Sequence, residues 1–321
     1  MVAMSQARAL GAGALALWLA ALLPPGADPA RAADSVPEIK RTLDSGGRER
    51  TYYLHVPAGL DPGGSPLVVV LHGGAGTGPG AAKQTHFSAA ADLHHFIVAY
   101  PNGTDRARPI MNLMGKPGFL TWNAGHCCAY AMLNRIDDVA FIRAMVAEIE
   151  RDHAIDRRQV YATGISNGGM MSYRLACEAS DVFAAIGVVS GSLVTPGCAP
   201  AAPVAILHIH GTADEYVPLE GGIGRKSIGK TLYPPPRDGI ALWVKADGCR
   251  AQPGETQDAA GVKTLDYRDC RAGTEVALRL IEGGGHSWPG GDRMLALLDA
   301  PSPALDATEV IWRFFAAHPK W

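Results

Sequence analysis

The sequence predicts an α/β fold with one mostly parallel central sheet and helices on both faces. Strand-like and helix-like segments alternate along most of the chain, which is typical of a parallel sheet. The run from Pro66 to His72 is continuously apolar up to its last residue, as strands covered on both faces are. With 321 residues, 47% hydrophobic and 19% charged, the chain can bury one large core. No linker divides it, so we expect a single domain over residues 34–321.

The first 33 residues resemble a signal peptide. Arg8 gives a weakly basic start, Leu10 to Leu23 is apolar, and Ala30-Arg31-Ala32 offers small residues for cleavage. About fourteen apolar residues fall short of the roughly twenty that span a bilayer, so a membrane anchor is the weaker alternative. We expect a secreted protein, extracellular or periplasmic, that is not bound to the membrane after cleavage near Ala32 or Ala33.

The first half of the mature chain should contain four strands and two helices. A segment from Thr104 to Asn134 has no clear period and is expected to be a long functional loop. Asp137 and Asp138 are expected to cap the following helix, although paired acids also suggest catalysis. The expected strands are Arg50–Pro57, Pro66–His72, Phe96–Tyr100 and Gln159–Thr163, and the helices are Ala81–His95 and a segment from Asp137 to about Ile149.

The second half continues the alternation. The expected helices are Gly169–Cys177, Asp238–Ala246 and Ala307–Ala317, and the strands are Ala184–Ser190, Val204–His210, Lys263–Tyr267 and Val276–Ile281.

The motif Gly164-Ile165-Ser166-Asn167-Gly168 lies between an expected strand and an expected helix. It fits the GxSxG pattern, in which a sharp strand-to-helix turn presents a serine above the sheet. Glycines at both ends leave room for that turn. The pattern alone occurs by chance in a chain with 38 glycines, but its context indicates a nucleophilic serine. Ser166 is therefore the expected nucleophile.

A serine nucleophile needs a base and an acid, which in this architecture follow later strands in the order Ser, acid, His. The strand ending at His210 leads to Asp214, and the strand ending at Ile281 leads through three glycines to His286. We predict a catalytic triad of Ser166, Asp214 and His286. Glu215 remains an alternative acid.

An oxyanion would be stabilised by backbone N–H groups. We expect the N–H of Asn167, which follows the nucleophile, and that of Gly74, in the loop after an early buried strand. The segment Gly76 to Ala81 also matches a dinucleotide-binding pattern, GxGxxA. The next strand ends in Pro101-Asn102-Gly103 without an acid to bind a ribose, which argues against that interpretation.

Composition narrows the possible partners. A net charge of −2 and the lack of a basic stripe give no reason to expect nucleic acid. His208 and His210 lie on one strand face, where hydrogen-bonded core histidines are more common than metal ligands, and we expect no metal site. Six cysteines in an exported chain favour disulfides. Cys249 with Cys270 is a plausible pair. The pairing of the other four, Cys127, Cys128, Cys177 and Cys198, stays open.

A series of short motifs covers nearly the whole mature chain in order: His72-Gly73-Gly74, Tyr100-Pro101-Asn102-Gly103, Trp122-Asn123, Asp137-Asp138-Val139, the Ser166 motif extended to Gly169-Met170, His208-Ile209-His210-Gly211-Thr212-Ala213-Asp214 and Gly284-Gly285-His286-Ser287-Trp288-Pro289-Gly290. Together they resemble the polyhydroxybutyrate depolymerase and feruloyl esterase family. The resemblance implies an α/β-hydrolase fold, a secreted and cofactor-free serine esterase, and the same three catalytic residues.

The expected substrate is a small or oligomeric ester. Trp122 and Trp288 are candidates for contact with its acyl group. Feruloyl esters, acetyl esters and short hydroxyalkanoate oligomers are not ranked by the sequence. Depolymerases of crystalline polyester usually carry a further polymer-binding domain. Because we expect only the catalytic domain here, we expect slow action on such a polymer. A serine peptidase, a polyester depolymerase and a non-catalytic binding protein of the same fold remain alternatives, and the oligomeric state stays open.

Overall fold

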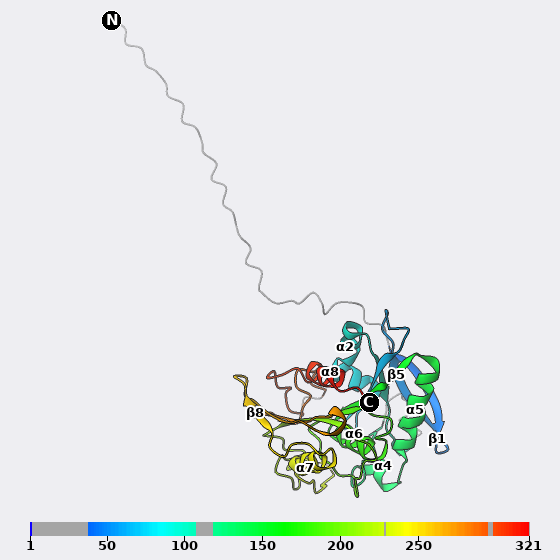
Figure 1. Ribbon diagram of the computed structural model, residues 1–321. Helices are drawn as coiled ribbons and strands as arrows, with labels where there is room; N and C mark the ends of the chain where they lie inside the picture. The colour runs from blue at the N-terminus through cyan, green and yellow to red at the C-terminus, as the bar shows by residue number, and fades with distance from the viewer. Residues whose placement is uncertain (2–37, 107–117, 228, 295–297, 321) are drawn as a thin grey trace. The chain divides into compact units, whose positions relative to one another are not determined.

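One sheet of ten strands organises the residues that the computed structural model describes, namely 1, 38–106, 118–227, 229–294 and 298–320 (Figure 1). The predicted signal peptide lies outside these residues, apart from Met1. The strand order is β1-β2-β4-β3-β5-β6-β7-β10-β9-β8. The six central strands from β4 to β10 in this order are parallel, and two antiparallel strands flank them on each side. This arrangement confirms the predicted fold class.

The central strands are buried along most of their length, as their apolar sequences predicted. Their parallel pairing brings the carboxyl ends of β3, β5, β6, β7 and β10 to one edge of the sheet. The strands are β1 Ile39–Ser45, β2 Arg48–His55, β3 Ser65–Leu71, β4 Ile97–Pro101, β5 Ile155–Ile165, β6 Ala185–Val189, β7 Ala205–Gly211, β8 Gly254–Gln257, β9 Val262–Tyr267 and β10 Val276–Ile281.

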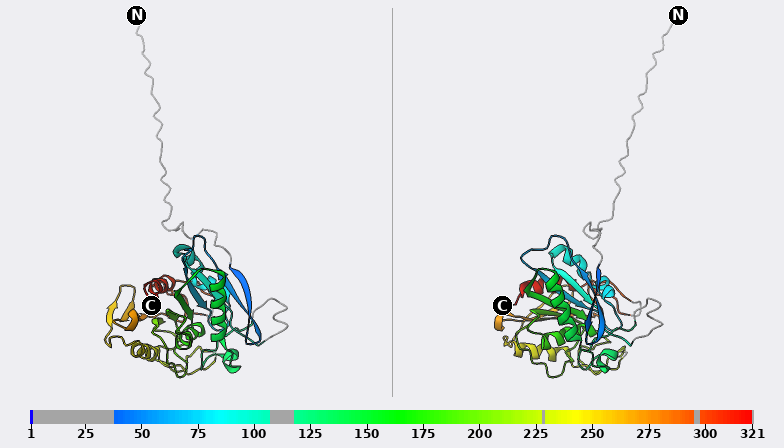
Figure 2. Two further views of the ribbon diagram at one scale, coloured as in Figure 1. Left: turned by 45° about the vertical axis from the view of Figure 1, so that its right-hand side comes forward. Right: turned by 90° about the vertical axis from the view of Figure 1, so that its right-hand side faces the viewer.

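Helices cover both faces of the sheet (Figure 1, Figure 2). One apolar core joins α5, α6 and α7 to one face, and a second joins α1, α2 and α8 to the other. The helices are α1 Gly78–Thr85, α2 Phe87–His94, α4 Ala129–Leu133, α5 Asp138–Asp152, α6 Asn167–Glu178, α7 Pro236–Ala246 and α8 Ala307–Ala317, with a short 3₁₀ turn, η2, at Arg271–Gly273. α6 lies directly behind the Ser166 corner, so its packing fixes the position of that corner.

Among the helices that the sequence predicted, one differs clearly in the structure. The helix expected over Ala81–His95 is two helices, α1 and α2, separated at His86. His86 has a φ of 58°, in the left-handed region that ends a helix. Its backbone N–H bonds to Ala82 O as a C-cap, and the chain then starts a new helix.

The three disulfides of the described residues include the predicted pair Cys249–Cys270. The two pairs that the sequence left open are Cys177–Cys198 and the adjacent Cys127–Cys128. Each disulfide lies in a loop or at a helix end rather than within the central strands. Disulfides at these sites fit a protein exported to an oxidising compartment.

Asp247, at the end of α7, carries a fully buried carboxyl group. Its Oδ2 accepts a hydrogen bond from Thr274 Oγ1 at 3.1 Å, but Oδ1 has no partner among the described residues. Burial raises the pKa of Asp247 to about 6. The native state therefore holds a proton between about pH 4 and 6, where the unfolded chain has lost it.

From this difference we expect Asp247→Asn to stabilise the protein at neutral pH. The wild-type group contributes stability below about pH 4, and that contribution is lost as the pH rises through 6. The variant should therefore gain on the order of 1–2 kcal/mol at pH 7.5 and little at pH 4. Urea unfolding at both pH values measures this. Asp44→Asn, on exposed β1, is the control and should show no such pH-dependent gain.

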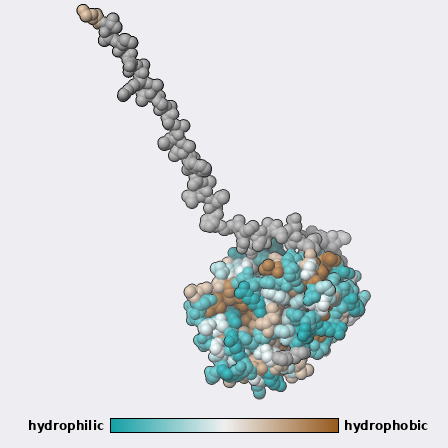
Figure 3. Space-filling view, turned by 45° about the horizontal axis from the view of Figure 1, so that its top comes forward, coloured by the Kyte–Doolittle hydropathy of each residue, from teal (hydrophilic) through white to brown (hydrophobic). Residues whose placement is uncertain are grey.

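No helix within the described ranges is long and apolar enough to cross a membrane. On the face shown in Figure 3, hydrophilic residues cover most of the described surface, and hydrophobic residues gather in separate patches. Ligands of parallel sheets bind at the carboxyl ends of the strands. The edge of the sheet at which the parallel strands end is therefore the expected place for a functional site.

Candidate active site

Ser166 occupies the turn between β5 and α6. Its backbone has φ 56° and ψ −122°, a conformation that L residues rarely adopt. The side chain is partly exposed, whereas Ile165 and Asn167 on either side are buried. The strand, the strained serine and the helix follow in the order that the motif predicted.

The two motif glycines permit this corner by close contact of backbone with backbone. A Cβ on Gly164 would lie 2.6 Å from Leu71 O, and one on Gly168 would lie 2.2 Å from the same atom. Contacts below 3.0 Å with backbone leave no space for a methyl group. The corner and the end of β3 are therefore pressed together, which brings Ser166 beside the loop that follows β3.

Asp214 and His286 lie in loops after neighbouring parallel strands, β7 and β10. The loops touch, since a Cβ on Gly211 would lie 2.2 Å from Gly284 O. His286 Nδ1 donates a hydrogen bond of 2.8 Å to Asp214 Oδ2. The structure thus joins the predicted acid and base, and they lie at the edge of the sheet that carries Ser166.

Asp214 is held by two further donors. Its Oδ1 accepts from the N–H groups of Tyr216 and Val217, both at 2.9 Å. Burial alone would raise the pKa of this carboxyl, but the charge and hydrogen bond of His286, together with His210 and the Val217 amide, hold it below the ordinary value. Asp214 is therefore an anion that can orient an imidazole.

The alternative acid, Glu215, points elsewhere. Its carboxylate pairs with Lys226 at 3.0 Å and with Arg225. The structure therefore favours Asp214 over Glu215 as the partner of His286.

A network that the sequence did not predict holds the loop that carries His286. His286 N donates to Asp299 Oδ2 at 2.8 Å, and Lys226 Nζ donates to Asp299 Oδ1 at 2.9 Å. The half-buried ring of Tyr216 stacks on the imidazole of His286, with ring centroids 4.9 Å apart. No motif marks these three residues, because loops far apart in sequence bring them together.

The predicted oxyanion donors lie side by side. A Cβ on Gly74 would lie 3.9 Å from Asn167 Cβ, and one on neighbouring Gly73 would lie 3.6 Å from Ser166 Cβ. Within the described residues, the N–H groups of Gly74 and Asn167 donate no hydrogen bond. Two unused N–H groups at the corner are suitable donors for an oxyanion.

Trp122 anchors this region, and its indole is fully buried. Asn167 Oδ1 accepts from Trp122 N at 2.8 Å, and Asn167 Nδ2 donates to Trp122 O at 3.0 Å. The indole Nε1 donates to His72 O at 2.9 Å. Trp122 therefore links the side chain of Asn167 to the loop after β3, and its burial gives no support to the expected substrate contact.

His72 completes that anchor. Its Nδ1 donates to Gly73 O at 2.7 Å, and its Nε2 accepts from Gly103 N at 3.0 Å. Burial lowers the pKa of His72 to about 4, so the ring is neutral at physiological pH, as one donor and one acceptor nitrogen require.

Trp288 also differs from expectation. Its side chain is fully buried, its Nε1 donates to Thr308 Oγ1 at 3.0 Å, and it packs edge-on against Phe87. The indole points into the core beneath α8 rather than toward the site. It therefore packs beneath the loop that carries His286, and its burial gives no support to the expected contact with an acyl group.

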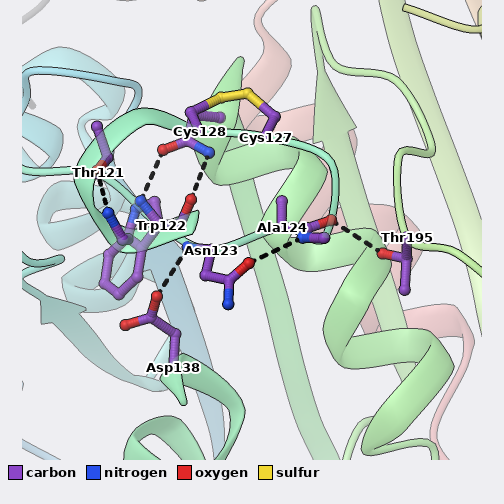
Figure 4. The surroundings of a disulfide bond; sticks show 11 residues. Thr121, Trp122, Asn123, Ala124, Cys127, Cys128, Asp138 and Thr195 are labelled. Carbon is purple, nitrogen blue, oxygen red and sulfur yellow. Dashed lines mark hydrogen bonds between the residues drawn. A yellow bond between two sulfur atoms is a disulfide. The ribbon is translucent and has the colours of Figure 1, made fainter. Parts of the chain in front are cut away.

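The long segment after β4 returns to the core at Asn123 (Figure 4). Asn123 N donates to Asp138 Oδ2 at 2.8 Å, and Asp138 Oδ1 accepts from Arg50 at 2.7 Å. Asp137 caps α5 as predicted, by accepting from Ala140 N. Asp138 is instead fully buried and tethers the segment, while residues 107–117 of the segment lie outside the described residues.

The adjacent disulfide closes the same segment (Figure 4). Cys128 N donates to Trp122 O at 3.0 Å, and Thr195 Oγ1 donates to Ala124 O at 3.3 Å. Cys127 packs in a small core with Met170 of α6. The segment is therefore fastened to the helix that carries Ser166 at its start.

His208 and His210 are hydrogen-bonded core residues, as the sequence analysis favoured. His208 bonds to Tyr173, and His210 bonds to Val217 O at 2.8 Å. Both rings are buried. Across the described residues, no group of three or more His, Cys, Asp or Glu side chains is arranged to hold a metal ion.

Comparison with known proteins places the chain in a family. Residues 50–218 match the model of the esterase PHB depolymerase family. Feruloyl esterase B of Piromyces equi is 35% identical over 172 residues, which cover 52% of this chain and 31% of that protein. Putative esterase NocK of Nocardia uniformis subsp. tsuyamanensis is 32% identical over 271 residues, 78% of this chain and 74% of that protein.

A solved structure gives independent support for the fold. Acetyl xylan esterase from Aspergillus awamori superimposes with a TM-score of 0.58 at 18% identity, over 87% of this chain and 99% of that one. The fold is therefore that of the α/β-hydrolases. The chain spans 31% of feruloyl esterase B and 58% of the probable feruloyl esterase C of Aspergillus clavatus. From the family match and the length shared with NocK, the chain belongs to the esterase PHB depolymerase family of carboxylic ester hydrolases.

Proposed function

We propose that the protein is a serine esterase that hydrolyses carboxylic esters through an acyl-serine intermediate on Ser166. The observation that carries this proposal is the 2.8 Å hydrogen bond from His286 to the buried Asp214, at the same sheet edge as the strained Ser166 corner. A hydroxyl, an imidazole oriented by a carboxylate and two unused amides are the parts that acyl transfer requires.

In the proposed reaction, His286 Nε2 accepts the Ser166 Oγ proton as the oxygen attacks the ester carbonyl. The carbonyl oxygen becomes negative and accepts hydrogen bonds from the N–H groups of Gly74 and Asn167. His286 then returns the proton to the leaving alcohol, and Asp214 stabilises the charged imidazolium while it exists. A water molecule activated by His286 releases the acid from Ser166 by the same steps in reverse.

The names of the relatives support a substrate class. Several are named feruloyl esterases, and the family model is named for polyhydroxybutyrate depolymerase. We propose feruloyl or acetyl esters of plant polysaccharide, or short hydroxyalkanoate oligomers. The three disulfides support export, extracellular or periplasmic.

An ester panel tests the proposal. It should contain nitrophenyl acetate and butyrate, methyl ferulate, acetylated xylan, hydroxybutyrate oligomers, crystalline polyhydroxybutyrate film and a nitroanilide. We expect turnover of the nitrophenyl esters and of methyl ferulate or the oligomers, with slower action on the film. Turnover of the amide but of no ester would instead identify a peptidase.

Tyr216 is a candidate for selecting an acyl group, because it lies against the proposed base. Its ring is half-buried, and one face stacks on His286. Tyr216→Leu should therefore lower kcat/KM for methyl ferulate about 3- to 10-fold more than for nitrophenyl butyrate, the effect of one aromatic pair. Tyr216→Phe keeps the ring and should retain the wild-type ratio. An equal fall on both esters would show that Tyr216 only supports His286.

A further inference from the structure

A chain of three buried side chains runs from α6 to the loop that carries Asp214. Tyr173 OH lies 2.8 Å from His208 Nδ1, and His208 Nε2 lies 2.9 Å from His210 Nδ1. His210 Nε2 lies 2.8 Å from Val217 O. Tyr173 and His208 are fully buried, and His210 is 1% exposed. The histidines are thus linked to the candidate acid loop at one end and to a helix residue at the other.

The direction of every hydrogen bond in this chain is determined by its last member. Val217 O can only accept, so His210 Nε2 must carry a hydrogen. A neutral His210 then accepts at Nδ1, which requires His208 to donate from Nε2. His208 in turn accepts at Nδ1 from the hydroxyl of Tyr173. Burial lowers the pKa of both histidines, which agrees with the neutral rings that this pattern needs.

The same nitrogen of His210 also lies near Asp214. His210 Nε2 lies 3.6 Å from Asp214 Oδ2, the oxygen that accepts from His286 Nδ1. Val217 connects the two groups directly, because its carbonyl accepts from His210 while its N–H donates to Asp214 Oδ1. The opposite tautomer of His210 would turn a lone pair toward both the carbonyl and the carboxylate.

We propose that His210 is a positioning residue for the catalytic acid, and that His208 and Tyr173 hold it in the required tautomer. His210 fixes the Val217 turn and presents an N–H toward Asp214, so that the carboxylate stays aligned with His286. The inference rests on the proposed triad of the preceding subsection and adds buried residues behind it. A displacement of about 1 Å in such a group can cost about 10²-fold in rate.

Three variants and one control test the proposal, with kcat and KM measured on nitrophenyl butyrate. His210→Leu should lower kcat about 30- to 100-fold with KM within about threefold, because alignment affects the transition state. His210→Gln retains an N–H at similar reach and should recover kcat to within about fivefold of wild type. Tyr173→Phe should lower kcat about two- to fivefold.

The control is Tyr161→Phe, which removes a buried hydroxyl that has no hydrogen-bond partner among the described residues. It should leave kcat unchanged. The low-field proton resonance of His286 Nδ1–H provides a readout independent of turnover. This resonance should be lost or shifted in His210→Leu and retained in His210→Gln.

Wild-type kcat in His210→Leu, or an equal loss in His210→Leu and His210→Gln with the resonance unchanged, would overturn the positioning role. If His210→Leu does not fold, His210→Gln and Tyr173→Phe test the proposal instead. A Tyr173→Phe variant with the same kcat as Tyr161→Phe would then contradict a role for the hydrogen bonds from Tyr173 to His210. Full activity in Ser166→Ala would instead overturn the proposed function. The resonance would still report on the alignment of Asp214 with His286 in that case.

Discussion

Replacing Ser166 or His286 by alanine is expected to lower kcat/KM for nitrophenyl butyrate by on the order of 10⁴-fold or more, with folding intact. Ser166 would supply the attacking oxygen, and His286 would move its proton, so that either loss stops the same step. Removing both should cost little more than removing one, because the two residues act as a unit. Retention of more than about a tenth of the activity in Ser166→Ala would refute the assignment of the nucleophile.

Asp214→Asn belongs to the same prediction and has a matched control. An amide at this position can donate to His286 Nδ1 and so favours the wrong tautomer, which costs about 10⁴-fold in a Ser-His-Asp triad. Glu215→Gln changes the adjacent carboxylate in the same way, but Glu215 pairs with Lys226 instead of His286. It should stay within about threefold of wild type, as changes to ion pairs near the surface have small effects. Equal losses in the two variants would contradict the role of Asp214.

The central part of the fold could be predicted from the sequence because burial leaves a direct signal there. Strand β3, for example, reads Leu67 to Leu71 without a polar residue, as a strand covered on both faces must. The outer strands leave no such signal. β8 is exposed at every position, so its sequence has no apolar alternation, and β1 was missed for a similar reason. Their positions depend on pairing with β9 and β2.

The site shows the same division between local and tertiary information. Ser166, Asp214 and His286 each follow a recognisable strand, so their order along the chain was sufficient to propose them as a triad. The burial of Trp122 and Trp288 could not be predicted from the local sequence. It depends on contacts with residues far along the chain, such as His72 for Trp122, or on another helix, such as Thr308 of α8 for Trp288. An aromatic residue close to a catalytic motif is not thereby exposed to a substrate.

Gly168→Ala is expected to have the second largest effect, because one methyl group would separate two parts of the site. Its Cβ would lie 2.2 Å from Leu71 O and 2.6 Å from His72 O, so either α6 or the end of β3 must move. Movement would take the N–H of Gly74 away from that of Asn167. We expect kcat to fall about 10²- to 10³-fold, the effect of losing one oxyanion donor, and stability to fall by about 1–3 kcal/mol.

Gly74→Ala makes the same chemical change at a position with space for it. Its Cβ would be 3.9 Å from Asn167 Cβ, an ordinary contact, and the residue does not have a positive φ that would strain an alanine. The substitution keeps the backbone N–H that is proposed to bind the oxyanion. Thermal unfolding and kcat should therefore remain close to wild type, with kcat reduced less than about tenfold. If Gly168→Ala were as active and stable as Gly74→Ala, close packing of the corner against β3 would not be what aligns the two amides.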